Sequence, residues 1–124
     1  MRKQVTFDTV RKLALELPGV EEGTTYGAPA FKIGGKLLAC IPTHKSAEPG
    51  SLVVGIDAAD RAELIAEEPD TYYIRDHYKG YPCVLVRLSR IKPEALRDLL
   101  RGALRFVTSK RDRLRRPRSL GKPK

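Results

Sequence analysis

The chain has 124 residues, of which 41% are hydrophobic and 31% charged, and its formal net charge is +9. This length suits one domain, and the balance of apolar and charged residues excludes an intrinsically disordered protein. No apolar run approaches the roughly 18 residues of a membrane-spanning helix, and the N-terminus lacks the apolar centre of a signal peptide, so we expect a cytoplasmic protein that enters no membrane.

The positive charge is concentrated at the C-terminal end. Residues 110–124 contain eight basic residues and one acidic residue, whereas residues 1–109 contain sixteen and fourteen. The C-terminal segment therefore carries a net charge of +7, and the rest of the chain only +2. We predict one folded domain at residues 1–109, followed by a basic, disordered tail at residues 110–124.

Periodicity and turn residues predict the order helix, three strands, helix, two strands, helix. Three helices are expected: one after the cap Thr6, one after the cap Asp57, and one that begins at Pro93. The expected strands are residues 26–33, 36–41, 51–56, 71–75 and 82–88. Gly34 and Gly35 supply the positive φ angles of a two-residue hairpin between the first two strands. Residues 20–25 are expected to form a polar turn, and residues 76–81 a hairpin loop around Gly80.

The hairpin connections predict an α+β fold with an antiparallel five-stranded sheet and flanking helices. Alternation along residues 36–41 and 82–88 places apolar side chains on both faces of the sheet. We expect the terminal helices to provide the cover. A ligand or a second copy on one face is the alternative, so the protein is expected to be a monomer or a homodimer.

Several segments carry a resemblance to a known family. The chain reads LELPGVEEGTTYGAPAFKIGGKLLACI, then DTYYIRDHYKGYPCVLVRL, then a helix that begins with proline. In these segments it resembles the MmcQ/YjbR-like family of small bacterial proteins, over roughly Phe7 to Arg105. The resemblance implies an antiparallel sheet flanked by helices, sometimes described as a double-wing DNA-binding arrangement. It also implies DNA binding of low or unknown sequence specificity, with no cofactor.

Under this resemblance, the hairpin tips around Gly34-Gly35 and around Gly80 are candidate wings. Basic residues among aromatic ones can pair with phosphates and stack on bases. The candidates are Lys32, Lys36, Arg75, His77, Tyr78, Lys79 and Tyr81. The basic tail can add affinity for DNA by releasing counterions. Its candidates are Lys110, Arg111, Arg113, Arg115, Arg116 and Arg118. For both sets the alternative is a role in solubility or packing alone.

A function from another class is a protein-interaction or small-ligand-binding module with an incidental basic tail. The second sheet face and the turn at residues 26–29 can form a shallow groove lined by Tyr26, Phe31, Tyr73 and Tyr81, although core packing also explains these aromatics. A contiguous positive face on the wings would favour DNA binding. A neutral body with an apolar cleft would favour the module.

The sequence shows no recognisable active site. Cys40, His44, His77 and Cys83 lack the closely spaced pairs of a structural zinc site, so we expect buried free thiols and no metal. The chain also lacks a G-x-S-x-G elbow, a P-loop and a dinucleotide fingerprint. We therefore expect no enzyme and no cofactor, with nucleic acid, namely DNA, as the partner.

Overall fold

The computed structural model describes residues 5–109, which form an antiparallel sheet of six strands and three α-helices. The elements are α1 (Phe7–Leu15), β1 (Glu21–Thr25), β2 (Ala28–Ile33), β3 (Lys36–Cys40), β4 (Ser51–Gly55), α2 (Ala58–Glu67), β5 (Tyr72–Tyr73), the 3₁₀ helix η1 (Asp76–Tyr78), β6 (Cys83–Arg87) and α3 (Pro93–Val107). The strand order across the sheet is β1-β2-β3-β4-β6-β5. The α+β class and the antiparallel sheet are thus confirmed, and the predicted tail at residues 110–124 lies outside the described residues.

The expectation of five strands is wrong, because the segment expected to be a polar turn forms the edge strand β1. This strand pairs with β2, and its first four residues are exposed, so it lacks the apolar alternation that marks a strand in a sequence. Tyr26 and Gly27 connect β1 to β2 with φ angles of 51° and 78°. Two consecutive positive φ angles are the requirement of a type I′ hairpin turn.

The hairpin expected at Gly34-Gly35 is confirmed, and the two glycines have φ angles of 55° and 80°. The pairing register between β2 and β3 shifts just after Phe31. Because of this irregularity, the neighbours Leu38 and Ala39 are both fully buried in the same core cluster. The simple alternation expected along residues 36–41 would place these two neighbours on opposite faces of the sheet, and for this pair it is wrong.

The strand expected at residues 71–75 is shorter in the structure, where β5 contains only Tyr72 and Tyr73. It pairs with β6 as expected. Instead of an open hairpin loop, the following residues form η1, in which the Tyr78 amide donates to the Arg75 carbonyl oxygen. Tyr78 is only 9% exposed and belongs to a core cluster beneath the sheet. Burial of this ring explains why the chain coils here instead of extending the strand.

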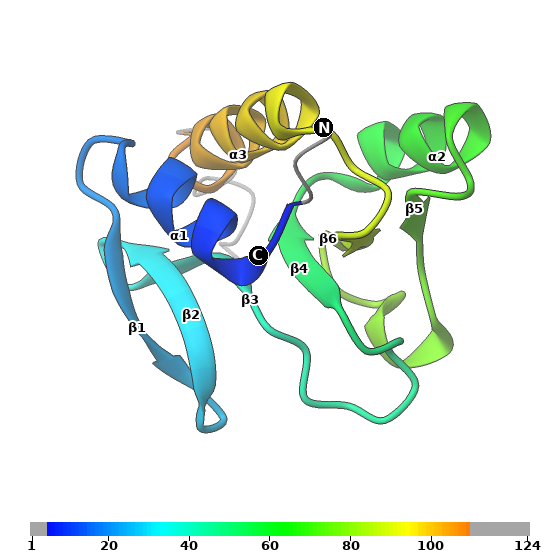
Figure 1. Cartoon of the computed structure of the whole chain (residues 1–124), viewed down its shortest axis with the longest axis horizontal. Coiled ribbons are helices and arrows are strands. Elements are labelled where there is room, and N and C mark those ends of the chain that lie inside the picture. The colour runs from blue at the N-terminus through cyan, green and yellow to red at the C-terminus, as the bar shows by residue number, and fades with distance from the viewer. Residues whose placement is uncertain (1–4, 110–124) are drawn as a thin grey trace, which may run out of the picture.

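All three α-helices lie on one side of the sheet (Figure 1). The main core joins α1 and α3 to this face through side chains such as Val10, Leu52 and Leu100. Helix α3 begins at Pro93 as expected, and one face of it is buried. Helix α2 follows its cap Asp57 as expected but contains no buried residue, and Leu64 and Ile65 provide its partial contact with the core.

The opposite face of the sheet has a smaller core. It consists of Ala30, Cys40, Val53, Tyr73, Tyr78, Cys83 and Leu85. The connection between β3 and β4 and the helix η1 lie on this side (Figure 1), so the terminal helices do not cover both faces. Both cysteines are buried and free, as expected. Within residues 5–109 no helix is long and apolar enough to cross a membrane.

Candidate binding groove

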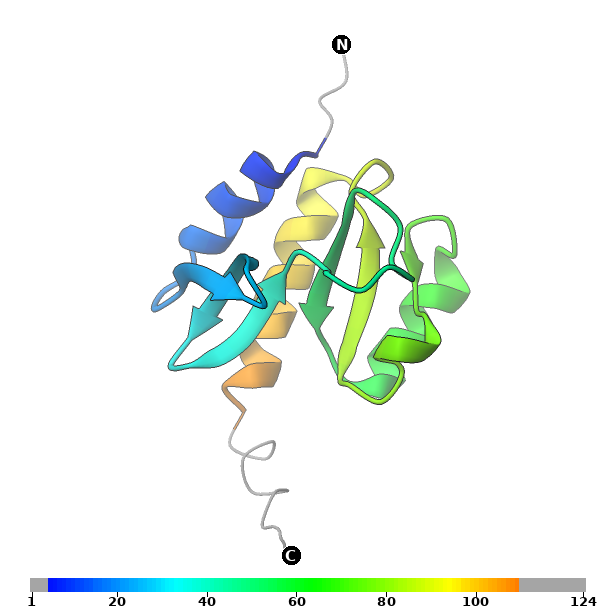
Figure 2. The ribbon, with the colours of Figure 1, turned by 90° about the horizontal axis from the view of Figure 1, so that it is seen from below.

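A groove of about 880 Å³ opens on the side of the sheet opposite α1, where β3 and β4 separate. Only Ala39 and Cys40 of β3 pair with β4, so the two strands diverge beyond this point. The end of α3 lies behind the gap, and a Cβ placed on Gly55 would be 3.4 Å from Val107 Cγ1. Figure 2 shows α3, in yellow to orange, between the two halves of the sheet.

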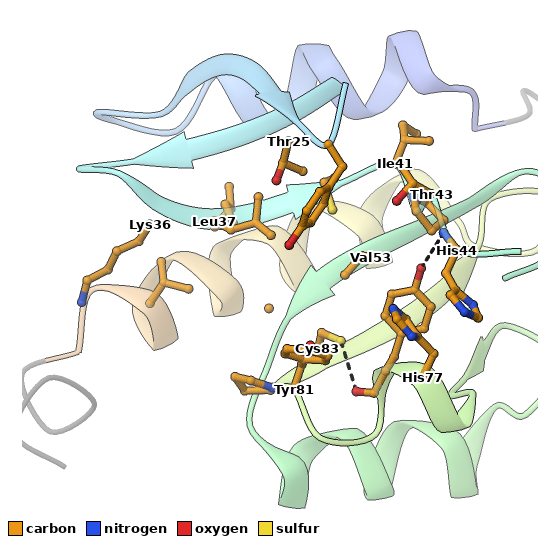
Figure 3. A pocket seen from close by; sticks show the side chains of 18 of the residues that line it. Thr25, Lys36, Leu37, Ile41, Thr43, His44, Val53, His77, Tyr81 and Cys83 are labelled. Atoms are coloured by element: carbon orange, nitrogen blue, oxygen red, sulfur yellow. Dashed lines mark hydrogen bonds between the residues drawn. The ribbon is translucent and has the colours of Figure 1, made fainter. Parts of the chain in front are cut away.

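Three parts of the chain form the walls of the groove. The β1–β2 turn contributes Thr25 and Tyr26, and β3 contributes Leu37 on the same side. The segment after η1 contributes Tyr81 on the opposite side (Figure 3). The beginning of the β3–β4 connection, residues 41–44, closes one end of the groove.

Exposed apolar side chains gather in this groove. Within residues 5–109, the large hydrophobic residues that are exposed are Leu15, Tyr26, Leu37 and Tyr81, and the last three all line the groove. Tyr26 is 92% exposed and Tyr81 is 59% exposed. Such clustering on an otherwise ordinary surface is typical of a binding site.

The polar part of the groove is a stacked pair of histidines. The rings of His44 and His77 lie 3.7 Å apart at an interplanar angle of 9°, and Tyr78 meets both rings edge-on. His44 Nδ1 accepts a hydrogen bond from the Ser46 amide at 3.1 Å. Burial lowers the pKa of His44, and the neighbouring His77 and Lys45 lower it further. His44 is therefore neutral near pH 7, and the stacked rings present a flat aromatic surface.

The β3–β4 connection is fixed to the sheet by Glu48. This carboxylate pairs with Arg75 at 3.0 Å and with Arg87 at 2.8 Å. The two guanidinium groups also lie over the Tyr73 ring, at 4.4 and 4.3 Å from its centroid. The hydrogen bond from Arg87, followed by the charges of both arginines, lowers the pKa of Glu48. This cluster holds the connection that carries His44 against the sheet.

The sequence model of the YjbR family matches residues 15–105, which is most of the chain. The chain belongs to the YjbR family. Uncharacterized protein Rv2570 of Mycobacterium tuberculosis (strain H37Rv) and uncharacterized protein Mb2600 of Mycobacterium bovis are each 31% identical to it over 112 residues. Each match covers 79% of this chain and 84% of the relative.

Among solved structures, the crystal structure of protein DR2400 of Deinococcus radiodurans is similar to this chain, with a TM-score of 0.70 and 27% sequence identity. The match covers 86% of this chain and 81% of that chain. This similarity supports the α+β architecture of the YjbR domain. None of these names states an activity.

The cationic wing residues are largely engaged within the YjbR domain itself. Arg75 belongs to the Glu48 cluster, and Lys79 pairs with Asp76 at 3.3 Å. Tyr78 is buried, and its hydroxyl oxygen accepts a hydrogen bond from the His44 amide. Of the candidates after β5, His77 and Tyr81 present their rings to the groove.

The two lysines of the β2–β3 hairpin lie on the other side of the groove. Lys36 extends away from the histidine pair toward the end of α3 (Figure 3), and its Nζ is buried, with no hydrogen-bond partner among residues 5–109. Lys32 is half-buried and lies opposite Glu21 of β1. The six tail candidates, Lys110 to Arg118, lie outside the described residues. The basic wing residues therefore do not converge on one site.

The predicted aromatic lining is half correct. Tyr26 and Tyr81 line the groove, whereas Phe31 and Tyr73 are buried in the two cores. Leu37 was not predicted from the sequence to line the groove. The alternation of Leu37 with the buried Leu38 was the available signal that its side chain lies on the other face of the strand. The contribution of α3 was also missed, because a helix end that fills a gap between strands leaves no local pattern.

The chemistry of the groove suits binding. None of the described residues that line it is acidic, and those that can carry positive charge are Lys36, His44 and His77. Within residues 5–109, no three His, Cys, Asp or Glu side chains are grouped to hold a metal ion. Burial raises the pKa of the Cys40 thiol to about 11 and also raises that of Cys83, so neither is an activated nucleophile.

Proposed function

We propose that this YjbR protein binds nucleic acid, with the groove as the contact surface of the folded domain and residues 110–124 as the cationic part. The position of the basic segment supports this proposal. Phe106 and Val107, at the end of α3, line the groove, and the basic segment begins at residue 110. A polyanion attracted by a net charge of +7 is therefore brought to the groove.

The charge distribution explains why the phosphate contacts are assigned to the C-terminal segment. Residues 5–109 contain fourteen Lys and Arg and fourteen Asp and Glu, which gives a formal net charge of zero. The folded domain therefore supplies little long-range attraction for a polyanion. For the double-wing arrangement implied by the family, we propose the β1–β2 turn and the segment after η1 as the wings, in place of the β2–β3 hairpin at Gly34-Gly35 that was expected from the sequence. These two segments contribute aromatic side chains to the groove, and few free cationic groups.

We further propose that the preferred nucleic acid is DNA, bound in the cytoplasm with low sequence specificity. Phosphate contacts hold a protein on DNA without reading its sequence. No step of this proposal involves a metal, a cofactor or catalysis.

Fluorescence anisotropy with labelled DNA over a salt series tests the proposal. The full chain is compared with a variant in which Arg111, Arg113, Arg115, Arg116 and Arg118 are replaced by glutamine. Each phosphate contact contributes about −0.9 to the log–log salt slope on duplex DNA, so we expect the variant to lose most of that slope and to bind at least roughly tenfold more weakly. The absence of binding by the full chain at low salt would refute the proposal.

The formal net charge of zero in residues 5–109 and the apolar groove match the features expected of the alternative, a module that binds a protein segment or an apolar small molecule, and they favour it as a second candidate. The exposed rings and Leu37 are the observation behind it, because they need no cationic tail to bind an apolar partner. In that case, replacement of the five tail arginines would leave the function unchanged.

A further inference from the structure

We propose that Tyr26 and Tyr81 are base-stacking residues, so that the groove accepts unpaired nucleotides and the protein prefers single-stranded nucleic acid to a duplex. This inference rests on the nucleic-acid binding proposed above and goes beyond it by naming the form of the ligand and the residues that distinguish it.

The backbone conformation of Tyr26 is the first argument. Tyr26 is the one non-glycine residue with positive φ within residues 5–109, at 51°. The left-handed conformation costs a residue with a Cβ about 1–2 kcal/mol, and asparagine or glycine is the usual choice at this position of a type I′ turn. The Tyr26 side chain is 92% exposed, so core packing does not compensate for this cost. A strained, solvent-exposed ring at the edge of a groove indicates a role in binding.

The backbone of Tyr81 is held by hydrogen bonds, whereas its ring is exposed to solvent. The Arg61 guanidinium donates hydrogen bonds to the carbonyl oxygens of Tyr81 and Cys83, each at 3.0 Å. The Tyr81 amide donates to the Tyr78 carbonyl oxygen at 3.0 Å. These bonds hold the segment in place, while the side chain remains 59% exposed. A held backbone with an exposed ring lowers the entropic cost of stacking against a ligand.

The placement of the two tyrosines is the second argument. Tyr26 and Tyr81 come from different walls of the groove, and Figure 3 shows Thr25, the neighbour of Tyr26, and Tyr81 on opposite sides of it. The stacked rings of His44 and His77 extend the aromatic surface, with 6.4 Å between the His77 and Tyr81 centroids. Among the described residues, no carboxylate lines the space between the walls. The groove therefore offers flat apolar surfaces without repelling an anion.

Only an unpaired base can use these surfaces. In a duplex the faces of the bases are covered by neighbouring base pairs, whereas in a single strand they are free to stack on an aromatic side chain. The basic segment that begins at residue 110 attracts either form. The tyrosines then distinguish single-stranded from duplex nucleic acid, because only the bases of a single strand can stack on them.

The test compares a labelled single strand of about 12 thymidines with a duplex of the same length, a size within the range of one single-strand binding site. Three full-length proteins are measured at one salt concentration: the unmodified chain, the double variant Tyr26→Asn/Tyr81→Ala, and the control Leu15→Ala. Leu15 is exposed like the tyrosines but lies outside the groove, on α1. Asparagine suits the first position of this turn, and the Tyr81 ring is 59% exposed, so we expect both substitutions to preserve the fold; urea denaturation of the double variant checks this.

We expect the unmodified chain and the control to prefer the single strand, and the double variant to bind it roughly tenfold more weakly with unchanged duplex affinity. A variant with Tyr26→Phe should retain the preference, because it retains the ring. Equal binding of both DNA forms by all three proteins would overturn the stacking role while leaving the proposed function intact. No binding of either form would refute the proposed function itself.

Discussion

The imidazole rings of His44 and His77 lie face to face, 3.7 Å apart, and join the β3–β4 connection to the 3₁₀ helix η1. Both segments belong to the open side of the sheet, opposite the three α-helices of the described domain (Figure 1). Burial of His44, and to a lesser degree its contact with His77 and Lys45, disfavours the protonated form of the His44 ring and lowers its pKa. The position of His44 against the sheet therefore favours the neutral ring.

The first prediction is a loss of stability as the pH falls from about 7.5 to 5.5. The pKa of His44 is lowered in the folded protein, so the unfolded chain takes up the proton first. The contribution of neutral His44 to the free energy of unfolding is complete above the ordinary histidine pKa of about 6.5, and it decreases as the pH falls below that value. We expect the midpoint of urea denaturation to decrease over this range, and to decrease less in His44→Gln. Identical pH dependence of the two proteins would contradict this assignment.

The second prediction concerns the strained turn between β1 and β2. Replacing Tyr26 by asparagine should raise the free energy of unfolding by about 1 kcal/mol, because asparagine tolerates the left-handed conformation and suits a type I′ turn before glycine. Tyr26→Phe is the matched control and should leave the stability unchanged. Urea denaturation of both variants provides the measurement. A loss of stability in Tyr26→Asn would mean that the ring contributes to the fold and would remove the argument from strain.

The third prediction concerns Arg61, whose guanidinium binds the carbonyl oxygens of Tyr81 and Cys83. Arg61→Ala should lower the free energy of unfolding by about 1 kcal/mol, since it leaves these acceptors without a charged donor. We also expect faster amide hydrogen exchange in residues 79–83. Arg97→Ala, at an exposed position of α3, is the control and should change neither quantity. If exchange in residues 79–83 is unchanged in Arg61→Ala, this arginine does not hold the groove wall.

The elements with a strong local signal could be predicted from the sequence. Helix α3 has a wide apolar face behind Pro93, and the β2–β3 hairpin has Gly34-Gly35 at the turn. Strand β1 had no such signal, because it is an exposed edge strand whose pairing with β2 depends on a turn that contains Tyr26 and not asparagine or glycine at its first position. A tyrosine at a position of positive φ is rare enough that the turn was not recognised.

The groove was only partly predictable for a different reason. Alternation showed that both faces of the sheet are apolar, and composition showed that the folded domain is nearly neutral. The short pairing of β3 with β4 and the packing of the distant Val107 against Gly55 are tertiary features that leave no local pattern. The ion pair of Arg75 with Glu48 was likewise not predictable, because the two residues are far apart in the chain.

The fourth prediction concerns the two buried thiols. Burial raises the pKa of Cys40 to about 11, so at pH 8 its thiolate fraction is about a hundredfold below that of a free cysteine. We expect iodoacetamide to modify neither Cys40 nor Cys83 in the folded protein within the time that fully modifies both in urea. Mass spectrometry measures the extent of modification. Rapid modification of Cys40 without denaturant would show that the groove opens deeply enough to expose the smaller core.

The fifth prediction separates binding by charge from binding by aromatic rings on the wing after β5. Arg75 is held by Glu48 and lies over Tyr73, and Lys79 pairs with Asp76, so both cations are already engaged within the domain. We expect Arg75→Gln and Lys79→Gln to change the affinity for DNA by less than about twofold, because neither removes a free cation.

The same two variants should differ in stability. Arg75→Gln loses its contact with the Tyr73 ring and should be less stable by about 0.5–1 kcal/mol, whereas the exposed Lys79→Gln should be close to the unmodified protein. Anisotropy and urea denaturation on the same samples measure both effects. If Arg75→Gln weakens DNA binding roughly tenfold while remaining folded, the arginine leaves Glu48 to contact phosphate. The wing would then act through charge, and the neutral, aromatic groove would not be the main contact surface of the domain.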